Sequence, residues 1–398
     1  MIVLEALNAL YGDCLILRYT DNAGKEAAWV IDGGPRRENV GGKNVTVWKD
    51  FLLPRLLQLS PNKPVPIALG MVSHLDDDHI NGLQRLANRL TAVDPQHPAE
   101  VKFDRFWFNS FEDIIGPCRP VSSSDSVHPQ ALAGWILPNL GNEDAQAVVE
   151  SVGQGISLAA DLGTLHLKGN TPFGGLIVAK ADQTPIDVRG AKVTVLGPLK
   201  ARLDDLQTAW CEAVKKPTKE AREAAVQALF LPDAKLDRSI PNLSSIAVLV
   251  EIRGKKIFLT GDAQGKDLVE AWKALGYAEG PVNLDVLKVP HHGSQRNNPE
   301  IFLRHFVANN YVFSANGKYD NPDPETLEGL VSIHHARQFT MYFTNGDVTW
   351  EKPHRTQSGQ VASELGELLA RLKAEYGGTW DWKFRDENAS FVPIWVEE

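Results

Sequence analysis

The segment HLDDDH at positions 74–79 places two imidazoles and three carboxylates directly after an apolar run. Such a cluster is costly to remove from water unless cations or hydrogen bonds compensate its charges. Divalent metals supply that compensation, because imidazoles and carboxylates are their usual protein ligands. A solvated acidic helix start would explain the aspartates but not the flanking histidines. The segment therefore predicts metal binding, with His74 and Asp76 facing one ion and Asp78 and His79 facing another.

Three further polar clusters follow apolar runs elsewhere in the chain. Asp262 lies in TGDA (260–263), His291 and His292 open HHGS (291–294), and Asp32 begins DGG (32–34). Each cluster alone could be turn or helix-cap chemistry. Together with HLDDDH they provide the histidines and aspartates that a dinuclear metal site requires.

The apolar runs themselves have the pattern of strands, with β-branched and apolar residues bounded by Gly, Pro, Asn and Asp. Strands are predicted within 27–35, 66–83, 191–198, 244–252, 255–262, 285–294 and 311–317. Helical patterns follow several of them, at 81–90, 263–275, 299–307 and 325–336. This alternation predicts a layered α/β fold with the polar clusters gathered at strand ends.

The region 95–240 has a different composition. It contains a Ser/Pro-rich patch at 116–129 and helix-like stretches at 143–160 and 201–230. We expect an insertion on the core, serving as a lid or a substrate platform or only packing as a helical hairpin. Residues 351–398 are expected to form a C-terminal extension.

The composition narrows the function classes. The chain has 398 residues, with 41 Lys and Arg against 50 Asp and Glu, a formal net charge of −9. A nucleic-acid role would therefore need a local basic groove. No run approaches the roughly 20 apolar residues of a membrane span, and the N-terminus lacks signal-peptide features. Three cysteines without paired spacing predict no disulfide framework. We expect a cytoplasmic protein that does not bind membranes.

The order of these motifs resembles metallo-β-lactamase-fold hydrolases, and among them the metallo-β-lactamase-like domain of bacterial competence (DNA-uptake) channel proteins. The resemblance rests on YGDCLIL, VIDGGP, SHLDDDHINGL, VLGP, NLSSIAVLVE, FLTGDA, LKVPHHGS and SANGKYDNP. It implies a four-layer αββα sandwich over residues 1–350, interrupted by the 95–240 region, with two metals at the edge of the sheets.

The resemblance also implies ligands. His74 and Asp76 would hold the first metal, Asp78 and His79 the second, and Asp262 would bridge both. His292 would be the last ligand, with His291 beside it, although the reverse assignment is open.

Other positions depart from the family pattern. Asn242 stands where the superfamily has its third histidine, and Asn321-Pro322 where the competence type reads His-Pro. Asp76 stands where the general superfamily has a second histidine. The replacements at Asp76 and Asn242 make the first site richer in oxygen, which favours Mn²⁺ or Mg²⁺ relative to Zn²⁺. Asp32 and Asp13 are expected to orient ligands or loops rather than bind metal.

Two divalent ions, Zn²⁺ or Mn²⁺, imply hydrolysis by a metal-bridging hydroxide that Asp78 or Asp262 orients. The competence-type resemblance implies a phosphodiesterase or nuclease. Arg36, Arg37, Lys288 and Arg296 flank the motifs and could contact phosphates. Two alternatives stay open, namely hydrolysis of a carboxylic ester, thioester or lactam, and a non-catalytic metal-binding module.

Overall fold

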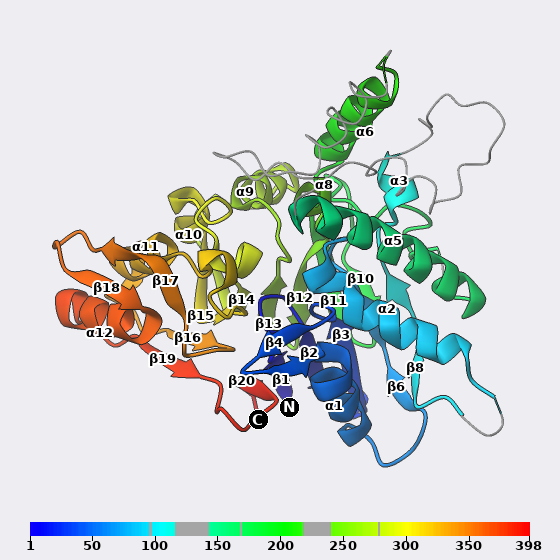
Figure 1. Ribbon diagram of the computed structural model, residues 1–398, viewed down its shortest axis with the longest axis horizontal. Coiled ribbons are helices and arrows are strands. Elements are labelled where there is room, and N and C mark those ends of the chain that lie inside the picture. The colour runs from blue at the N-terminus through cyan, green and yellow to red at the C-terminus, as the bar shows by residue number, and fades with distance from the viewer. Residues whose placement is uncertain (95–97, 116–142, 168, 217, 219–239, 278) are drawn as a thin grey trace.

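Two large β-sheets pack face to face, and helices cover the outer face of each, as Figure 1 shows with α2 and α5 on one side and α11 and α12 on the other. The computed structural model describes residues 1–94, 98–115, 143–167, 169–216, 218, 240–277 and 279–398. The predicted four-layer αββα order is confirmed.

The first sheet has six strands in the order β20-β1-β2-β3-β7-β9. Strands β20, β1, β2 and β3 pair antiparallel, whereas β3, β7 and β9 pair parallel. Its strands are Ile2–Leu7 (β1), Leu15–Thr20 (β2), Glu26–Ile31 (β3), Leu69–Met71 (β7), Phe106–Trp107 (β9) and Phe391–Glu397 (β20).

The second sheet has eight strands in the order β10-β11-β12-β13-β14-β15-β16-β19. The first four pair antiparallel, and the pairs from β13 to β19 are parallel. Its strands are Ile186–Val188 (β10), Ala191–Gly197 (β11), Ala247–Ile252 (β12), Lys255–Leu259 (β13), Val282–Lys288 (β14), Phe306–Phe313 (β15), Thr340–Phe343 (β16) and Asp381–Phe384 (β19).

Short two-stranded pairs complete the strands. They are Glu38–Val40 (β4) with Lys43–Val45 (β5), Val65–Ile67 (β6) with Val101–Phe103 (β8), and Thr349–Arg355 (β17) with Val361–Glu364 (β18).

Successive side chains along each strand point to opposite faces of the sheet, and this alternation explains the layers. In β12, Val248, Val250 and Ile252 belong to the core between the sheets, whereas Ala247 and Leu249 face the outer helices. Successive side chains of a strand point to opposite faces, so a strand that is apolar throughout must be covered on both sides. The near-continuous apolar runs of the sequence have this cause.

The helices over the six-stranded sheet include α2, whose apolar residues recur at helical spacing. Ile80, Leu83, Leu86 and Leu90 are buried in one cluster beneath it. This layer comprises Leu53–Gln58 (α1), Asp77–Thr91 (α2), Phe111–Ile115 (α3), Glu143–Thr164 (α5) and Lys200–Val214 (α6).

A second apolar cluster lies under the helices of the eight-stranded sheet. These helices are Gly265–Ala274 (α9), Glu300–His305 (α10), Pro324–His334 (α11) and Leu365–Tyr376 (α12). Shorter helical segments are Trp48–Leu52 (η1), Ile240–Leu243 (α8), Pro290–Gly293 (η2) and Lys318–Asp320 (η3). No helix in the described ranges is both long and apolar enough to cross a bilayer.

The 95–240 region supplies strands as well as helices. Strand β9 joins the six-stranded sheet, and β10 and β11 form one edge of the eight-stranded sheet. Of the predicted helix at 201–230, residues 200–214 form α6 and the part at 219–230 lies outside the described residues, as does the patch at 116–129. We therefore propose that the insertion is confined to the segments between these strands.

The last part of the chain packs on the core. Strand β20 pairs with β1, and β19 extends the eight-stranded sheet beside β16. The two chain ends consequently lie close together (Figure 1). Cys211 on α6 is disulfide-bonded, whereas Cys14 is a free, buried thiol.

Candidate metal centre

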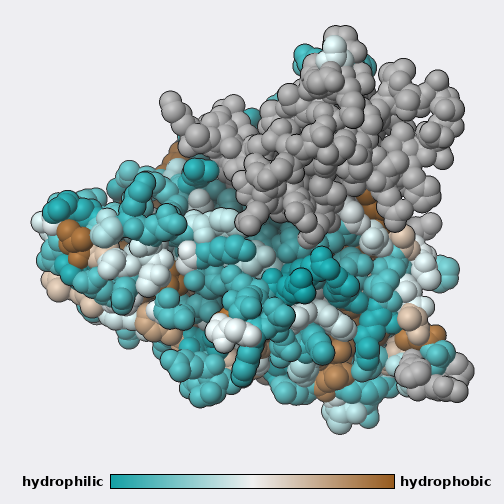
Figure 2. All heavy atoms as spheres, in the orientation of Figure 1, coloured by the Kyte–Doolittle hydropathy of each residue, from teal (hydrophilic) through white to brown (hydrophobic). Residues whose placement is uncertain are grey.

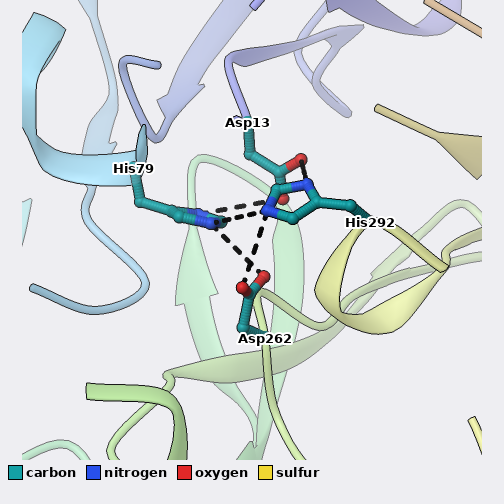
Figure 3. A group of neighbouring side chains, drawn as sticks. All are labelled: Asp13, His79, Asp262 and His292. Atoms are coloured by element: carbon teal, nitrogen blue, oxygen red, sulfur yellow. Dashed lines mark hydrogen bonds and ion pairs between the residues drawn. The ribbon is translucent and has the colours of Figure 1, made fainter. Parts of the chain in front are cut away.

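The predicted ligands converge where strands of both sheets end. His74, Asp76, Asp78 and His79 follow β7, Asp262 follows β13, and His291 and His292 follow β14. Figure 3 shows His79, Asp262, His292 and Asp13 pointing toward one another from four separate segments. Loops at the carboxyl ends of neighbouring parallel strands meet at one edge, which explains the convergence.

One group of ligand atoms surrounds the Nε2 atoms of His79 and His292, which lie 3.2 Å apart. The Asp78 Oδ2 atom is 3.3 Å from His292 Nε2 and 3.8 Å from His79 Nε2. Asp262 contributes Oδ1 at 3.3 Å from His79 Nε2 and Oδ2 at 3.6 Å from His292 Nε2. These four residues could hold one metal ion.

A second group shares the Asp262 carboxylate. His74 Nε2 lies 3.6 Å from Asp76 Oδ2 and 3.9 Å from Asp262 Oδ2. His291 Nε2 lies 3.5 Å from the same Asp262 oxygen. His291 therefore approaches Asp262 as closely as His292 does, and it could complete a second site with His74 and Asp76.

The opposite ring nitrogens are held by acceptors. His79 Nδ1 lies 2.9 Å from Asp32 Oδ2, His292 Nδ1 lies 2.8 Å from the Ser314 carbonyl oxygen, and His291 Nδ1 lies 2.9 Å from Asn297 Oδ1. An Nδ1–H bound in this way leaves the lone pair of the neutral imidazole on Nε2. Such partners are the usual means of orienting histidines toward a metal.

His74 is oriented through a serine. Ser73 Oγ donates to Asp32 Oδ2 at 2.8 Å and lies 3.0 Å from His74 Nδ1. Asp32 also accepts from the Ser73 backbone N–H at 2.7 Å. Asp32 thus contacts Ser73 and His79, at the two ends of the HLDDDH segment.

The donor set fits a cation. His74 Nε2 is buried and has no hydrogen-bond partner among the described residues. In the neutral tautomers described above, the facing Nε2 lone pairs of His79 and His292 would repel one another at 3.2 Å. Buried polar atoms without partners are rare and require an explanation. Divalent ions bound by these nitrogens and by Asp262 would explain both the His74 Nε2 atom without a partner and the close approach of His79 to His292.

The electrostatics favour positive charge at this centre. Burial alone would raise the pKa of the Asp262 carboxyl, but His79, His291 and His292 hold it well below its usual range. Burial alone would lower the pKa of His292, but Asp262 and Asp13 raise it to about 9. Burial alone would also lower the pKa of His79, but Asp262, Asp78 and Asp32 hold it well above its ordinary value.

Asp13 lies on the outer side of the two imidazoles. Its oxygens are 3.4 Å from His292 Nδ1 and 3.9 Å from His79 Nδ1, and Oδ2 accepts from Lys288 Nζ at 2.7 Å. Asp78 instead approaches the Nε2 atoms. We therefore propose Asp78 rather than Asp13 as the ligand.

The local backbone places these side chains under steric constraint. His291 and His292 both have left-handed backbones, with φ of 47° and 54°, which non-glycine residues rarely adopt. A Cβ on Gly12 would lie 1.9 Å from the Asp78 carbonyl oxygen, so only glycine allows the β1–β2 loop to approach the start of α2. The Asp13 N–H donates to that same oxygen at 3.1 Å.

Two residues that the sequence analysis singled out, Lys288 and Asn242, are both buried. Lys288, suggested as a phosphate contact, is 1% exposed and paired with Asp13, so that suggestion is wrong. Asn242 is buried in α8, and its carbonyl accepts from the N–H of Ser245, whose Oγ accepts from the Asp262 N–H. A ligand role for the Asn242 side chain stays a prediction.

The sequence reasoning missed Asn297 and Ser314, which orient His291 and His292. The consecutive amides of QRNNPE were a visible signal for Asn297. Ser314 contacts His292 through its backbone carbonyl, and a backbone contact cannot be predicted from residue type.

The rim of the centre carries aromatic rings and a cation. Lys318 Nζ lies 3.5 Å above the Tyr11 ring, and Tyr319, which is 70% exposed, meets Tyr11 edge-on. Burial, and then Asp78 and Asp77, raise the pKa of Tyr11, so its hydroxyl keeps its proton. Asn316 from the same loop donates to Glu38 at 2.9 Å and ties the loop to β4.

Comparisons with known proteins add little to this geometry. No family model matches the chain, and no curated protein matches it. Among solved structures the chain is similar to a mutant form of CmlA beta-hydroxylase, with 10% sequence identity and a TM-score of 0.38. That match covers 98% of this chain and 53% of the other, so this chain spans about half the length of the structure it matches.

Proposed function

We propose that this chain is a metal-dependent hydrolase of the metallo-β-lactamase type that cleaves phosphodiesters at a dinuclear centre. The observation that supports it best is the convergence of four Nε2 atoms and three carboxylates around Asp262. Each of these imidazoles has its Nδ1 next to a hydrogen-bonding partner. A set of histidines arranged in this way serves a metal better than a structural core.

The ligand assignment follows the two groups described above. His74, Asp76 and His291 would hold one ion, Asp78, His79 and His292 the other, and Asp262 both. The first group has more oxygen than a typical zinc site, which favours manganese there. A pair of divalent ions would polarise the phosphoryl group and make water a nucleophile near neutral pH.

Side chains of the protein itself would orient the water and contact the substrate. Asp262 and Asp78 hold a negative charge, because their pKa values are lowered by the surrounding histidines against the effect of burial. A water beside them could be oriented as a hydrogen-bond donor to either carboxylate. Lys318 at the rim is placed to approach the negative charge of a bound phosphate.

The phosphodiester substrate is favoured by the charges near the centre. The Arg36 backbone N–H donates to Asp77 Oδ2 at 3.1 Å, which places this arginine beside the ligands Asp76 and Asp78. Its side chain is exposed. A cationic flank suits a substrate whose scissile group is already anionic, and it offers nothing to a neutral ester or lactam.

The test is turnover of bis(p-nitrophenyl) phosphate by metal-stripped protein titrated with Mn²⁺ and with Zn²⁺. Asp262→Asn removes the proposed bridging carboxylate without changing its size. Asp267→Asn is the matched control, because Asp267, on α9, pairs with Arg202, on α6, and is not one of the proposed ligands. p-Nitrophenyl acetate is assayed alongside as a carboxylic ester.

We expect metal-dependent phosphodiesterase activity that Asp262→Asn abolishes and Asp267→Asn retains. Turnover of the acetate alone would replace the proposal with a carboxylic ester hydrolase. Stoichiometric metal binding without turnover of either compound would support a binding module instead.

A further inference from the structure

A small cavity lies between α2 and α5, and the polar side chains around it do not satisfy one another. Its volume is about 310 Å³, at the small end of the range of about 300–1,000 Å³ that ligand pockets span. Its polar lining includes Arg36, Asn81, Arg85 and Gln154. Figure 2 shows that the surface over α2 is strongly hydrophilic.

The side-chain amides of Asn81 and Gln154 are oriented by one carboxylate. Asn81 Nδ2 donates to Asp77 Oδ1 at 3.3 Å, and Gln154 Nε2 donates to the same oxygen at 2.6 Å. A carboxylate oxygen accepts hydrogen bonds and repels another acceptor, so Asp77 fixes which end of each amide is turned toward it. The two amide oxygens must therefore find donors elsewhere.

Those donors are missing from the described part of the chain. Asn81 Oδ1 and Gln154 Oε1 are both buried and have no hydrogen-bond partner among the described residues. Asn81 as a whole is only 1% exposed. Native proteins leave few buried acceptors without donors, and each such atom requires an explanation. Two of them, from the two helices that flank one cavity, indicate a ligand that carries O–H or N–H groups.

The same cavity offers positive charge for an anionic group. Arg36 and Arg85 line it, and among the described residues no carboxylate does. Arg85 is exposed and forms no ion pair with any residue that the structure describes. Arginine presents parallel N–H groups that fit the oxygens of a carboxylate or a phosphate. An ammonium group would meet this positive charge without a carboxylate partner, which disfavours zwitterions such as amino acids.

We propose that this cavity binds a small anion that carries hydroxyl groups, either a sugar phosphate or a sugar acid. Its anionic group contacts Arg85, with Arg36 beside it, and its hydroxyl groups donate to the amide oxygens of Asn81 and Gln154. A hydroxyl group satisfies these oxygens without adding positive charge. No described residue that lines the cavity is a proposed metal ligand, so this site is separate from the metal centre and does not rest on the proposed function.

The test is isothermal titration calorimetry in EDTA, which removes metal ions so that no probe can bind to a metal. Four probes separate the two parts of the recognition. Glucose 6-phosphate and gluconate carry both an anionic group and hydroxyl groups, inorganic phosphate carries the charge alone, and glucose carries the hydroxyl groups alone. Comparison of the first two probes distinguishes a phosphate from a carboxylate as the anionic group.

Three variants separate the contributions of the lining residues. Arg85→Gln removes the cation, and Gln154→Met removes one acceptor at nearly constant length. Arg89→Gln is the matched control, because Arg89 lies about one turn further along α2 and lines a neighbouring cavity of about 830 Å³ that Arg85 also lines. Both arginines are exposed, so neither change removes a buried side chain. A thermal melt of each variant checks that it is folded.

We expect glucose 6-phosphate or gluconate to bind at one site per chain. Arg85→Gln should weaken that binding about 10- to 100-fold and Gln154→Met about 2- to 10-fold, as for the loss of a hydrogen bond to a charged group and to a neutral one. Arg89→Gln should not change it. Inorganic phosphate should bind more weakly and be unaffected by Gln154→Met, and glucose should not bind.

Three outcomes would overturn the inference. The absence of saturable binding by both sugar compounds would leave the amide oxygens to water alone. Equal weakening by Arg85→Gln and Arg89→Gln would show an effect of net charge or of the larger cavity. Binding that Gln154→Met leaves unchanged would show an unspecific anion site that does not recognise hydroxyl groups.

Discussion

The ion pair between Lys288 and Asp13 gives the sharpest prediction for stability. Both side chains are 1% exposed, and Lys288 Nζ lies 2.7 Å from Asp13 Oδ2. Lys288 also donates to the Val289 carbonyl oxygen at 3.0 Å. Removing one partner of a buried pair leaves the other charge without compensation, at a cost of about 3–5 kcal/mol.

Asp13→Asn should therefore lower the free energy of unfolding by about 3–5 kcal/mol, because the amide keeps the size of the side chain but not its charge. Lys288→Met should be similarly destabilising. The double variant should lose less than the sum of the two single changes, since it leaves neither charge alone.

Urea unfolding followed by circular dichroism measures these free energies, with metal-free protein so that lost metal affinity does not contribute. Glu100→Gln is the control, because it breaks the pair with Arg89 at 2.6 Å, where the side chains are 51% and 32% exposed. That exposed pair should contribute at most about 1 kcal/mol. A loss below about 1 kcal/mol for Asp13→Asn, or strict additivity in the double variant, would refute the reasoning.

Three other predictions follow from further close contacts. Gly12→Ala should destabilise by at least about 1–3 kcal/mol in urea, because its Cβ would lie 1.9 Å from the Asp78 carbonyl oxygen; Gly153→Ala, with open space around it, should not. Asn297→Ala should weaken metal binding about 10- to 100-fold in a chelator competition, because Asn297 orients His291, and an unchanged affinity would exclude that role. His334 is buried, and burial lowers its pKa against the effect of its bond to Leu303. The unfolded chain therefore takes up this proton more readily, so stability should fall as the pH drops below about 6.5, the ordinary histidine value. His334→Gln should show a smaller loss of unfolding free energy between pH 8 and pH 5.5, and an equal loss would contradict the assignment.

The sequence was informative about the fold because apolar strands ended in polar clusters. The predicted segments 191–198, 244–252 and 255–262 became β11, β12 and β13, and the helix expected at 81–90 became part of α2. Local pattern could not show that β19 and β20 join opposite sheets, since their partners β16 and β1 are set by long-range pairing.

The residue types of the candidate site could be inferred from the sequence, but the contacts that hold those residues in position could not. HLDDDH, TGDA and HHGS are compact motifs, so their chemistry could be inferred from residue type alone. The burial of Lys288 could not, because its partner Asp13 is near the other end of the chain. A lysine next to a predicted site looks like a phosphate contact until its burial is known.

The position of that ion pair explains why metal binding and folding should be coupled here. Asp13 and the HLDDDH segment extend from the six-stranded sheet, whereas Asp262, His291, His292 and Lys288 extend from the eight-stranded sheet. The centre therefore exists only when the two sheets are packed together. The contact of Lys288 with Asp13 and the bond from Ser314 Oγ to the Gly12 carbonyl oxygen at 2.6 Å both cross between the sheets beside the ligands. Metal ions held from both sides would stabilise the same packing, because binding to the folded state alone adds to the free energy of unfolding. Added metal should consequently raise the free energy of unfolding of the wild type, Asp13→Asn and Glu100→Gln alike, because all three keep the proposed ligands.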